Sequence, residues 1–282
     1  MKSIADTLPE LVARLASVSQ TPRLDAQVLL AHALHKNHTW VLAHPEAVLA
    51  EPETAWIAQA LARLEQGAPL PYVLGEWEFF GLKFQVSPAA LIPRPETEAL
   101  VEQGLDWLRS HPGSHLAADI GAGTGCIAVA LAKNHPGLKV IASDISLAAM
   151  RLAAANIRRY NLERRIALIQ ADLIPPTAAR FGLICANLPY IPVETLERLK
   201  IHRWEPELAL RGGLDGLELI RRLVAQAPRY LAASSLLLLE IESRQGEAVR
   251  SLVSEAFPRA RIELLADLAG HDRLVRVESL SG

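Results

Sequence analysis

The sequence predicts a doubly wound α/β domain, with a mostly parallel sheet and antiparallel final strands, behind a small N-terminal helical bundle. Two observations predict this fold. Up to about residue 75, apolar residues recur at the spacing of amphipathic helices. From residue 116 onward, short apolar runs alternate with amphipathic segments, as in βαβ units whose parallel strands are covered by helices on both faces.

The N-terminal residues 1–75 carry three apolar stripes. They consist of Leu8, Leu11, Val12 and Leu15, of Leu24, Val28 and Ala31, and of Trp56, Ile57, Ala60, Leu61 and Leu64. Within each stripe most residues are three or four positions apart, so the stripe lies on one face of a helix. The Pro- and Gly-containing segment 67–75 then marks a domain boundary.

The segment after this boundary predicts a β-hairpin. Glu78–Val86 has aromatic and β-branched residues around Gly81, and we assign residues 76–92 to a hairpin linker. A helical pattern resumes over Leu91–Arg109, and residues 93–282 are assigned to the α/β domain.

The α/β domain is expected to alternate strands and helices in chain order. The expected strands are Leu116–Ile120, Lys139–Asp144, Ile166–Gln170, Phe181–Ala186, Leu236–Ile241, Arg261–Leu265 and Leu274–Val277. The expected helices are Cys126–Asn134, Leu147–Tyr160, Leu217–Leu231 and Gly246–Ala256. A Gly-His-Asp turn joins the last two strands, which predicts that they pair antiparallel.

Composition excludes several classes of protein. Half of the 282 residues are apolar and 21% are charged, which excludes a wholly disordered chain. The formal net charge is −2, and no basic excess favours nucleic acid or anionic membrane as a partner. The two cysteines cannot form a disulfide framework, and the N-terminus lacks the apolar stretch of a signal peptide. We therefore expect a cytoplasmic monomer without a membrane segment, without stable nucleic-acid binding and, since the histidines show no ligand spacing, without a metal site.

The sharpest local feature is a glycine-rich loop that follows one expected strand and begins a helix. Glycines allow a tight turn and a close approach of the backbone to a ligand, and the helix start offers free N–H donors. Such a loop could bind a dinucleotide or S-adenosylmethionine. Cys126 stands where a dinucleotide loop has Gly or Ala, and an acidic residue precedes the first Gly by two positions, which favours a methyltransferase. The predicted cofactor contacts in this loop are Asp119, Gly121, Ala122, Gly123, Thr124 and Gly125.

Two carboxylates follow the next two strands. Asp144 ends the second strand, where a short acceptor can take both ribose hydroxyls of an adenosyl group. Asp172 follows the third strand and could meet the adenine amino group, while Leu173 packs on the base. Together with the glycine loop, these residues predict S-adenosylmethionine as the cofactor and S-adenosylhomocysteine as the product.

An Asn-Leu-Pro-Tyr element closes the fourth strand, at the edge where open α/β sheets bind ligands. A planar nitrogen substrate, whether a side-chain amide or an exocyclic amine, is a poor nucleophile that needs acceptors for its two N–H groups. The Asn187 side-chain oxygen and the Leu188 carbonyl can supply them, and Pro189 restricts Leu188 to an extended conformation. Tyr190 offers a flat wall. These four residues form the predicted substrate site, with Asn187 as the catalytic residue that also borders the cofactor.

This combination resembles the protein N5-glutamine methyltransferases, and among them those that act on release factors. The similar segments are TPRLDAQVLLAHAL, PLPYVLGEWEFFGLKFQVSP, ALIPRPETEALVE, DIGAGTGCIAVALA, NLPYIP, EPELALRGGLDGLELIRRLVAQAPRYL and DLAGHDRLV. The resemblance implies a Rossmann-like class I methyltransferase domain, methyl transfer to the glutamine of the Gly-Gly-Gln motif of peptide-chain release factors, and substrate docking by residues 1–75. It also places Arg94, Pro95, Glu96 and Thr97 in a loop near the cofactor.

Two positions depart from the pattern of that family. Leu188 stands where Pro is usual, and Glu242 where Gly is usual. Three alternatives remain: a methyltransferase for a glutamine of a ribosomal protein, an adenine-N6 methyltransferase for DNA or RNA, and a non-catalytic adenosyl-binding scaffold. The second would need a basic surface, and the intact Asn187 and Tyr190 disfavour the third.

Overall fold

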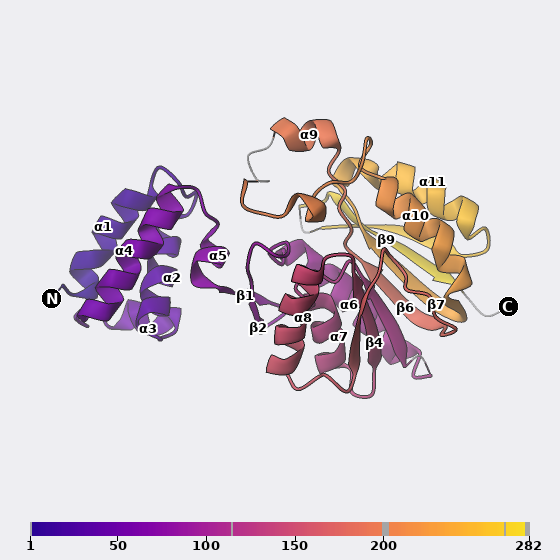
Figure 1. The fold of residues 1–282 in the computed structure, drawn as a ribbon, viewed down its shortest axis with the longest axis horizontal. Helices are drawn as coiled ribbons and strands as arrows, with labels where there is room; N and C mark the ends of the chain where they lie inside the picture. Colours follow the sequence, from indigo (N-terminus) through magenta and orange to yellow (C-terminus); the bar gives the residue numbers. More distant parts are fainter. Residues whose placement is uncertain (1, 114, 199–202, 268, 280–282) are drawn as a thin grey trace. The chain divides into compact units, whose positions relative to one another are not determined.

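The computed structural model describes residues 2–113, 115–198, 203–267 and 269–279. The chain divides into two compact units, Met1–Glu76 and Trp77–Gly282 (Figure 1). Each unit is described by itself.

The N-terminal unit is built from helices. They are α1 (Ile4–Leu15), α2 (Pro22–Ala33), α3 (His38–Ala43), α4 (Glu51–Glu65) and α5 (Leu70–Leu74). The side chain of Ser3 accepts a hydrogen bond from the Asp6 N–H and Asp6 returns one to the Ser3 backbone, a capping box that begins α1. Gly75 ends α5 in the left-handed region, at φ +76°. The unit's core includes Leu11, Leu15, Leu29, Leu30, Ile57 and Leu61.

Of the apolar stripe predicted for α2, Leu24, Val28 and Ala31, only Ala31 is buried. In α2 Leu24 is 49% exposed and Val28 is half-buried, whereas Ala26, Leu29 and Leu30 are buried. Because α2 is apolar on more than one side, two stripes share the helical spacing, and the contacts of α2 with α1, α3 and α4 decide which one is buried. The short helix α3, capped by Asn37, carries too few residues to show a stripe and was not predicted.

The second unit begins with the expected hairpin. Strand β1 (Glu76–Phe79) pairs with β2 (Leu82–Gln85) across Phe80 and Gly81. Both turn residues have positive φ, +52° and +67°, which is the conformation of a two-residue turn between twisted strands.

A seven-stranded sheet forms the centre of the second unit, in the order β5-β4-β3-β6-β7-β9-β8. Its strands are β3 (Leu116–Ile120), β4 (Lys139–Asp144), β5 (Ile166–Gln170), β6 (Phe181–Ala186), β7 (Leu231–Glu240), β8 (Arg261–Ala266) and β9 (Asp272–Ser279). The pairs from β5 to β7 are parallel, and β9 runs antiparallel to β7 and β8. The predicted mostly parallel sheet with antiparallel final strands is confirmed.

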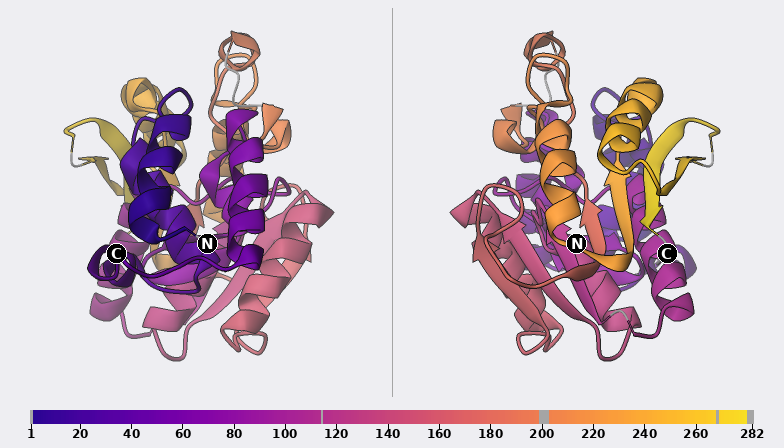
Figure 2. Two further views of the ribbon diagram at one scale, coloured as in Figure 1. Left: turned by 90° about the vertical axis from the view of Figure 1, so that its left-hand side faces the viewer. Right: turned by 90° about the vertical axis from the view of Figure 1, so that its right-hand side faces the viewer.

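Helices cover both faces of this sheet (Figure 2). The helices of this unit include α6 (Glu98–Ser110), α7 (Cys126–Asn134), α8 (Leu147–Arg159), α9 (Val193–Arg198), α10 (Glu218–Gln226) and α11 (Gly246–Ala256). In β6, Leu183 and Cys185 pack into the core formed with α6 and α7, whereas Ile184 and Ala186 pack with α10 and α11. This alternation, with a period of two, buries both faces of the strand.

Two helix boundaries differ from the prediction. The helix expected within Leu91–Arg109, behind the Pro93–Pro95 stop, begins at Glu98 after a 3-10 turn η1 (Pro95–Thr97). The helix expected up to Leu231 ends at Gln226. The chain then enters β7 at Leu231, five residues earlier than the apolar run indicated.

The strand order brings the loops after β3 and β6 to one edge of the sheet. The chain crosses from β3 to β4 on one side, whereas β6 adds on the other side of β3. The carboxyl ends of β3 and β6 therefore meet at a point where the strand order reverses, which is where open α/β sheets bind ligands.

Candidate active site

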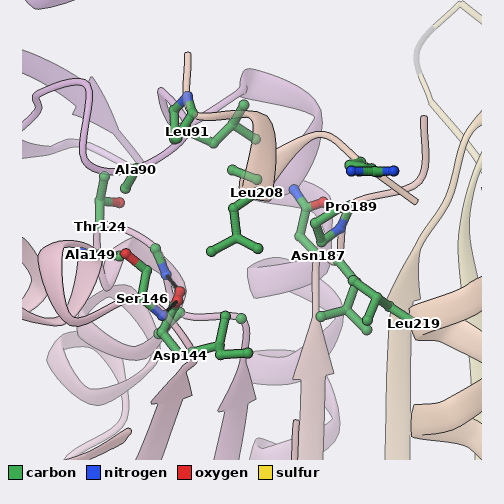
Figure 3. A pocket seen from close by; sticks show the side chains of 18 of the residues that line it. Ala90, Leu91, Thr124, Asp144, Ser146, Ala149, Asn187, Pro189, Leu208 and Leu219 are labelled. Carbon is green, nitrogen blue, oxygen red and sulfur yellow. Dashed lines mark hydrogen bonds between the residues drawn. The ribbon is translucent and has the colours of Figure 1, made fainter. Parts of the chain in front are cut away.

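A cavity of about 820 Å³ lies at this edge of the sheet. It is lined by the loop after β3, the ends of β4 and β5, the segment after β6, and the loops 89–97 and 206–214. In Figure 3 Asp144 and Asn187 stand on opposite sides of the cavity, and Leu208 extends between them. Of the predicted site residues, those that line it are Gly121, Ala122, Gly123, Thr124, Asp144, Asp172, Leu173, Asn187, Leu188 and Pro189.

The glycine loop turns sharply against β4. The N–H groups of Gly121 and Ala122 both donate to the Ser143 carbonyl at 2.9 Å. Gly121 and Gly123 have φ of +78° and +54°, where side chains are strained. A Cβ at position 121 would also lie 3.0 Å from Leu188 Cδ2, so glycine permits the close approach of the two cavity walls.

Asp144 is held in place by the backbone on both of its oxygens. Its Oδ2 accepts from the Gly123 N–H at 2.9 Å, and its Oδ1 accepts from the Ser146 N–H at 2.8 Å. Each carboxylate oxygen can accept a second hydrogen bond, and the side chain is only partly buried. The cavity thus presents an oriented carboxylate to ligand hydroxyls.

Asp119 and Gly125 do not line the cavity. Asp119 is fully buried in β3, and its Oδ2 accepts from the Ala128 N–H at 3.0 Å, in the first turn of α7. Burial raises the pKa of Asp119 to about 7, and the neighbouring charge of Asp144 adds to the rise. Gly125 is the N-cap of α7 at φ +77°, packed on Ala153. Asp119 and Gly125 therefore shape the glycine loop without lining the cavity.

Asp172 lies at the cavity edge in an ion pair. Its Oδ2 accepts from Arg222 Nη2 at 2.6 Å, with both side chains largely exposed. Leu173, which follows, is buried in the left-handed region at φ +68°, and its carbonyl accepts from the Ser143 hydroxyl at 2.8 Å. A strained backbone at a non-glycine residue persists only where its surroundings enforce it. Here it fixes the turn that carries Asp172 and Leu173 along the cavity wall.

Asn187 follows β6 with its amide oriented. Its Nδ2 donates to the Thr97 hydroxyl at 3.0 Å. Among the described residues no donor reaches its Oδ1 or the Leu188 carbonyl, so both acceptors remain available. Leu188 is buried and packs towards Gly121, and Pro189 lines the cavity beside Asn187 (Figure 3).

Tyr190 is set apart from the other three residues of its element. It is not among the cavity-lining residues, and burial raises its pKa to about 12. Its carbonyl accepts from Gln245 Nε2 at 3.1 Å, and a Cβ on Gly216 would lie 2.3 Å from that carbonyl. Tyr190 therefore anchors the glycine-containing segment 212–216 by its backbone.

Two carboxylates that sequence reasoning did not assign, Glu205 and Glu240, shape the site. The carboxylate of Glu205, almost fully buried, pairs with Arg94 at 2.6 Å and accepts from the Ile92 N–H at 3.3 Å, tying two cavity loops together. Glu240 is buried at the end of β7. In the sequence, the only sign of a role for Glu240 is that it is a charged residue at the end of an apolar strand.

The departure at Glu242 is accommodated without strain. Its φ is −75°, which every residue can adopt, and its carboxylate accepts from the Arg244 N–H at the start of a 3-10 turn. Glycine is therefore not required at this position.

The described residues offer neither a metal cluster nor a reactive thiol at the cavity. No group of three or more His, Cys, Asp or Glu among them could hold a metal ion. Burial raises the pKa of the cavity-lining Cys126 to about 12, so its thiol stays protonated. In the described part of the chain, every helix is too short or too polar to cross a membrane.

Comparisons with known proteins agree with this geometry. The family model "PrmC N-terminal domain" matches residues 6–75, and "Methyltransferase small domain" matches residues 99–200. A release factor glutamine methyltransferase of Moorella thermoacetica is 40% identical over 96% of this chain and 96% of its own. Its counterpart from Cereibacter sphaeroides is 39% identical over the same shares of both chains. The crystal structure of ribosomal protein L11 methylase from Lactobacillus delbrueckii subsp. bulgaricus, 22% identical, covers 68% of this chain and 83% of its own with a TM-score of 0.50, and shows the fold alone.

Proposed function

The chain belongs to the family of release factor glutamine methyltransferases, and from this premise we propose that it transfers a methyl group from S-adenosylmethionine to a glutamine side-chain amide of a peptide-chain release factor. The acceptor is the glutamine of the Gly-Gly-Gln motif. The observation that carries the proposal is the Asn187 amide, whose nitrogen is held by Thr97 and whose oxygen is left unpaired at the cavity.

The cavity residues fit this cofactor. Positions 121 and 123 have positive φ, where a side chain would be strained. Glycine meets this requirement and leaves the loop open to a ligand that lies on it. The oriented Asp144 carboxylate offers the acceptors that two ribose hydroxyls need. Leu173 presents an apolar surface for a base, and Asp172 keeps one oxygen outside its ion pair with Arg222. When bound, S-adenosylmethionine supplies an electrophilic methyl group.

The residues after β6 orient the acceptor nitrogen. Asn187 Oδ1 and the Leu188 carbonyl accept its two N–H groups and hold one face of the amide open. Positive charge develops on that nitrogen as its bond to the methyl carbon forms, so these acceptors stabilise the transition state more than the bound substrate. Methyl transfer first gives an N-methylated amide that is still protonated on nitrogen and positively charged. This cation is strongly acidic and loses its proton to water, so no general base is needed. Tyr190 supports the segment after β6 through its backbone.

The N-terminal unit serves in this proposal to dock the large protein substrate. It is a compact unit whose described buried residues are apolar or neutral, and the cavity is lined entirely by residues of the other unit. A protein substrate needs more surface than one glutamine side chain can occupy.

The proposal is tested with radiolabelled S-adenosylmethionine and a purified release factor. We expect label in the release factor and none in a version whose motif glutamine is replaced by alanine. Equal label in the two versions would contradict the proposal. A purified ribosomal protein in the same assay tests the competing substrate class, and preferential labelling of it would move the assignment there.

A further inference from the structure

Glu240 ends β7, next to the strand that Asn187 follows. Strands β6 and β7 pair in parallel, with Cys185 opposite Leu238 and Ala186 opposite Leu239. Asn187, which follows β6, and Glu240, which ends β7, each come one residue after the last of these pairs. Aligned residues of parallel strands project from the same face, and here that is the face on which α6 packs.

The Glu240 carboxyl is enclosed at this point. The residue is 3% exposed, as is Thr97, which immediately precedes α6. The side chains of Thr97 and Asn187 both lie near the carboxyl and oppose the effect of burial on its pKa. Among the described residues its Oε2 has no hydrogen-bond partner. Burying a carboxylate with an unpaired oxygen is costly, and among the described residues neither a helix cap nor an ion pair explains it.

The hydrogen-bond chain through Thr97 has a direction. The Thr97 hydroxyl accepts from Asn187 Nδ2 at 3.0 Å, so its own proton is left to be donated elsewhere. An ionised Glu240 can only accept, and it therefore fixes the hydroxyl proton on its own side. With the hydroxyl so oriented, only the nitrogen end of the Asn187 amide can face Thr97.

We propose that Glu240 is a positioning residue for methyl transfer, which acts through Thr97 to hold the Asn187 amide with its oxygen free for the substrate. The proposal rests on the proposed function, because it concerns the clamp that binds the acceptor amide. Loss of the Glu240 charge frees the Thr97 proton to point at Asn187, and the amide can then turn over and lose its acceptor.

The proposal gives the reaction a pH dependence. Burial raises the pKa of Glu240 to about 7, opposed first by Thr97 and then by Arg273 of β9. Glu96 of η1 adds to the rise, and Tyr190 and Cys126 also lie within the field of this carboxyl. The ionised form, which orients the clamp, is present above that pH. The transfer rate should therefore rise as the pH increases through about 7.

The test is a double-mutant cycle on the full-length protein, followed by single-turnover transfer from S-adenosylmethionine to a release factor. Glu240→Gln keeps the shape but gives up the charge-assisted hydrogen bond, so the rate above neutral pH should fall roughly tenfold and lose its rise with pH. In an Asn187→Ala background the same substitution should cause no further loss, because the amide that it orients is gone. Cofactor affinity, measured by calorimetry, should not change.

Two further variants make the outcome decisive. Glu278→Gln makes the same change at a buried carboxylate of β9 that bonds Trp107 Nε1 at 2.9 Å, away from the cavity, and should keep the wild-type rate and pH profile. Thr97→Val breaks the chain from the other side if Glu240→Gln does not fold, and should likewise cause no loss on top of Asn187→Ala. If wild-type transfer is observed but the losses of the single variants multiply in the double variants, the positioning role is overturned. Absence of wild-type transfer would instead count against the proposed function.

Discussion

The two units of the molecule bury different kinds of residue. In the N-terminal unit the buried polar residues, Thr7 and Gln27, are neutral, and the carboxylates with shifted pKa values lie at its surface. The second unit buries the carboxylates Asp119, Glu205, Glu240 and Glu278. Burying charge opposes folding, so a fold retains it where another requirement outweighs stability. Two of these four, Glu205 and Glu240, contact residues of the cavity wall.

The comparison teaches that the two units answer to different demands. The helical unit is explained by apolar packing and helix capping, which any stable docking surface needs. Both units hold a non-glycine residue at positive φ, His35 and Leu173, and a carboxylate oxygen without a partner among the described residues. In the α/β unit Leu173, Asp119 and Glu240 lie close to the carboxyl ends of the strands, where the cavity is. Substitutions of one residue type should therefore affect stability in one unit and chemistry in the other.

The largest expected effect contrasts two asparagines. Asn187→Ala removes one acceptor of the amide clamp and should lower kcat by about 10²–10³, the usual scale for one preorganised electrostatic partner. Asn37→Ala removes the cap of α3, whose side chain accepts from the Trp40 N–H at 2.8 Å, and should cost about 1 kcal/mol of unfolding free energy with kcat unchanged. Single-turnover rates and thermal melts measure both. A near-wild-type rate for Asn187→Ala would remove this residue from the clamp.

The next effect is a loss of stability with rising pH, which the buried carboxylates Asp119 and Glu240 of the second unit should cause. Burial raises the pKa values of Asp119 and Glu240 to about 7, from ordinary values of 3.8 and 4.5. Their protonated forms therefore stabilise the second unit below the ordinary values, and this stability is lost as the pH rises to about 7, at about 1.4 kcal/mol per pH unit for each group. In the N-terminal unit hydrogen bonds from Ser3 and Arg14 lower the pKa values of Asp6 and Glu65, so their contribution is lost only as the pH falls below the ordinary range.

Calorimetric unfolding of the intact protein at several pH values between 4.5 and 7 checks this contrast. The transition of the second unit should move to lower temperature as the pH rises. In a variant carrying Asp119→Asn and Glu240→Gln that slope should largely disappear. A slope retained in full would show that other groups cause it.

Sequence reasoning predicted the features that are encoded in local sequence patterns. The glycine loop, Asp144 and the residues after β6 are recognisable because each lies in a short motif at a strand end, and apolar runs gave the strands of the sheet. The contacts that complete the site join distant segments: Thr97 meets Asn187 across 90 positions, and Arg94 meets Glu205 across 111. No periodicity or local motif links such pairs, since only the strand order brings them together. The buried stripe of α2 was missed for a similar reason, because neighbouring helices select it.

A third contrast concerns two aspartates that accept hydrogen bonds locally. Asp144→Ala should weaken S-adenosylmethionine binding by roughly 1–3 kcal/mol, the cost of removing a charged acceptor from ribose donors. Asp25 of α2 accepts from the Ser19 and Thr21 hydroxyls, and Asp25→Ala should leave cofactor affinity unchanged. Isothermal calorimetry on both variants decides, and equal affinities would mean that Asp144 does not contact the cofactor.

Removal of residues 1–75 tests the division of labour itself. The shortened protein should bind the cofactor normally, but kcat/KM on a full-length release factor should fall about tenfold, equivalent to about 1.4 kcal/mol of binding. On a short peptide that contains Gly-Gly-Gln, the two proteins should perform alike, because the peptide lacks the rest of the release-factor surface that a docking unit would bind. Circular dichroism first establishes that the shortened protein is folded. Identical kcat/KM values on the whole release factor would refute the docking role.

The smallest effect is expected at Leu188, where this chain departs from the family pattern. Leu188→Pro keeps the carbonyl that accepts from the substrate and fixes φ, which reduces the freedom of the unfolded chain. Among the described residues the Leu188 N–H donates no hydrogen bond, so proline removes none. The side chain, however, is 4% exposed and lies against Gly121, and its loss leaves unfilled space behind the glycine loop. We expect a transfer rate within about threefold of wild type and an unfolding free energy lower by about 1 kcal/mol, the scale of a partly offset cavity. Single-turnover rates and melting curves, with Leu188→Ala as the matched cavity variant, separate the two contributions. A large loss of rate in the proline variant alone would show that the clamp depends on the conformational freedom of this residue and not only on its carbonyl.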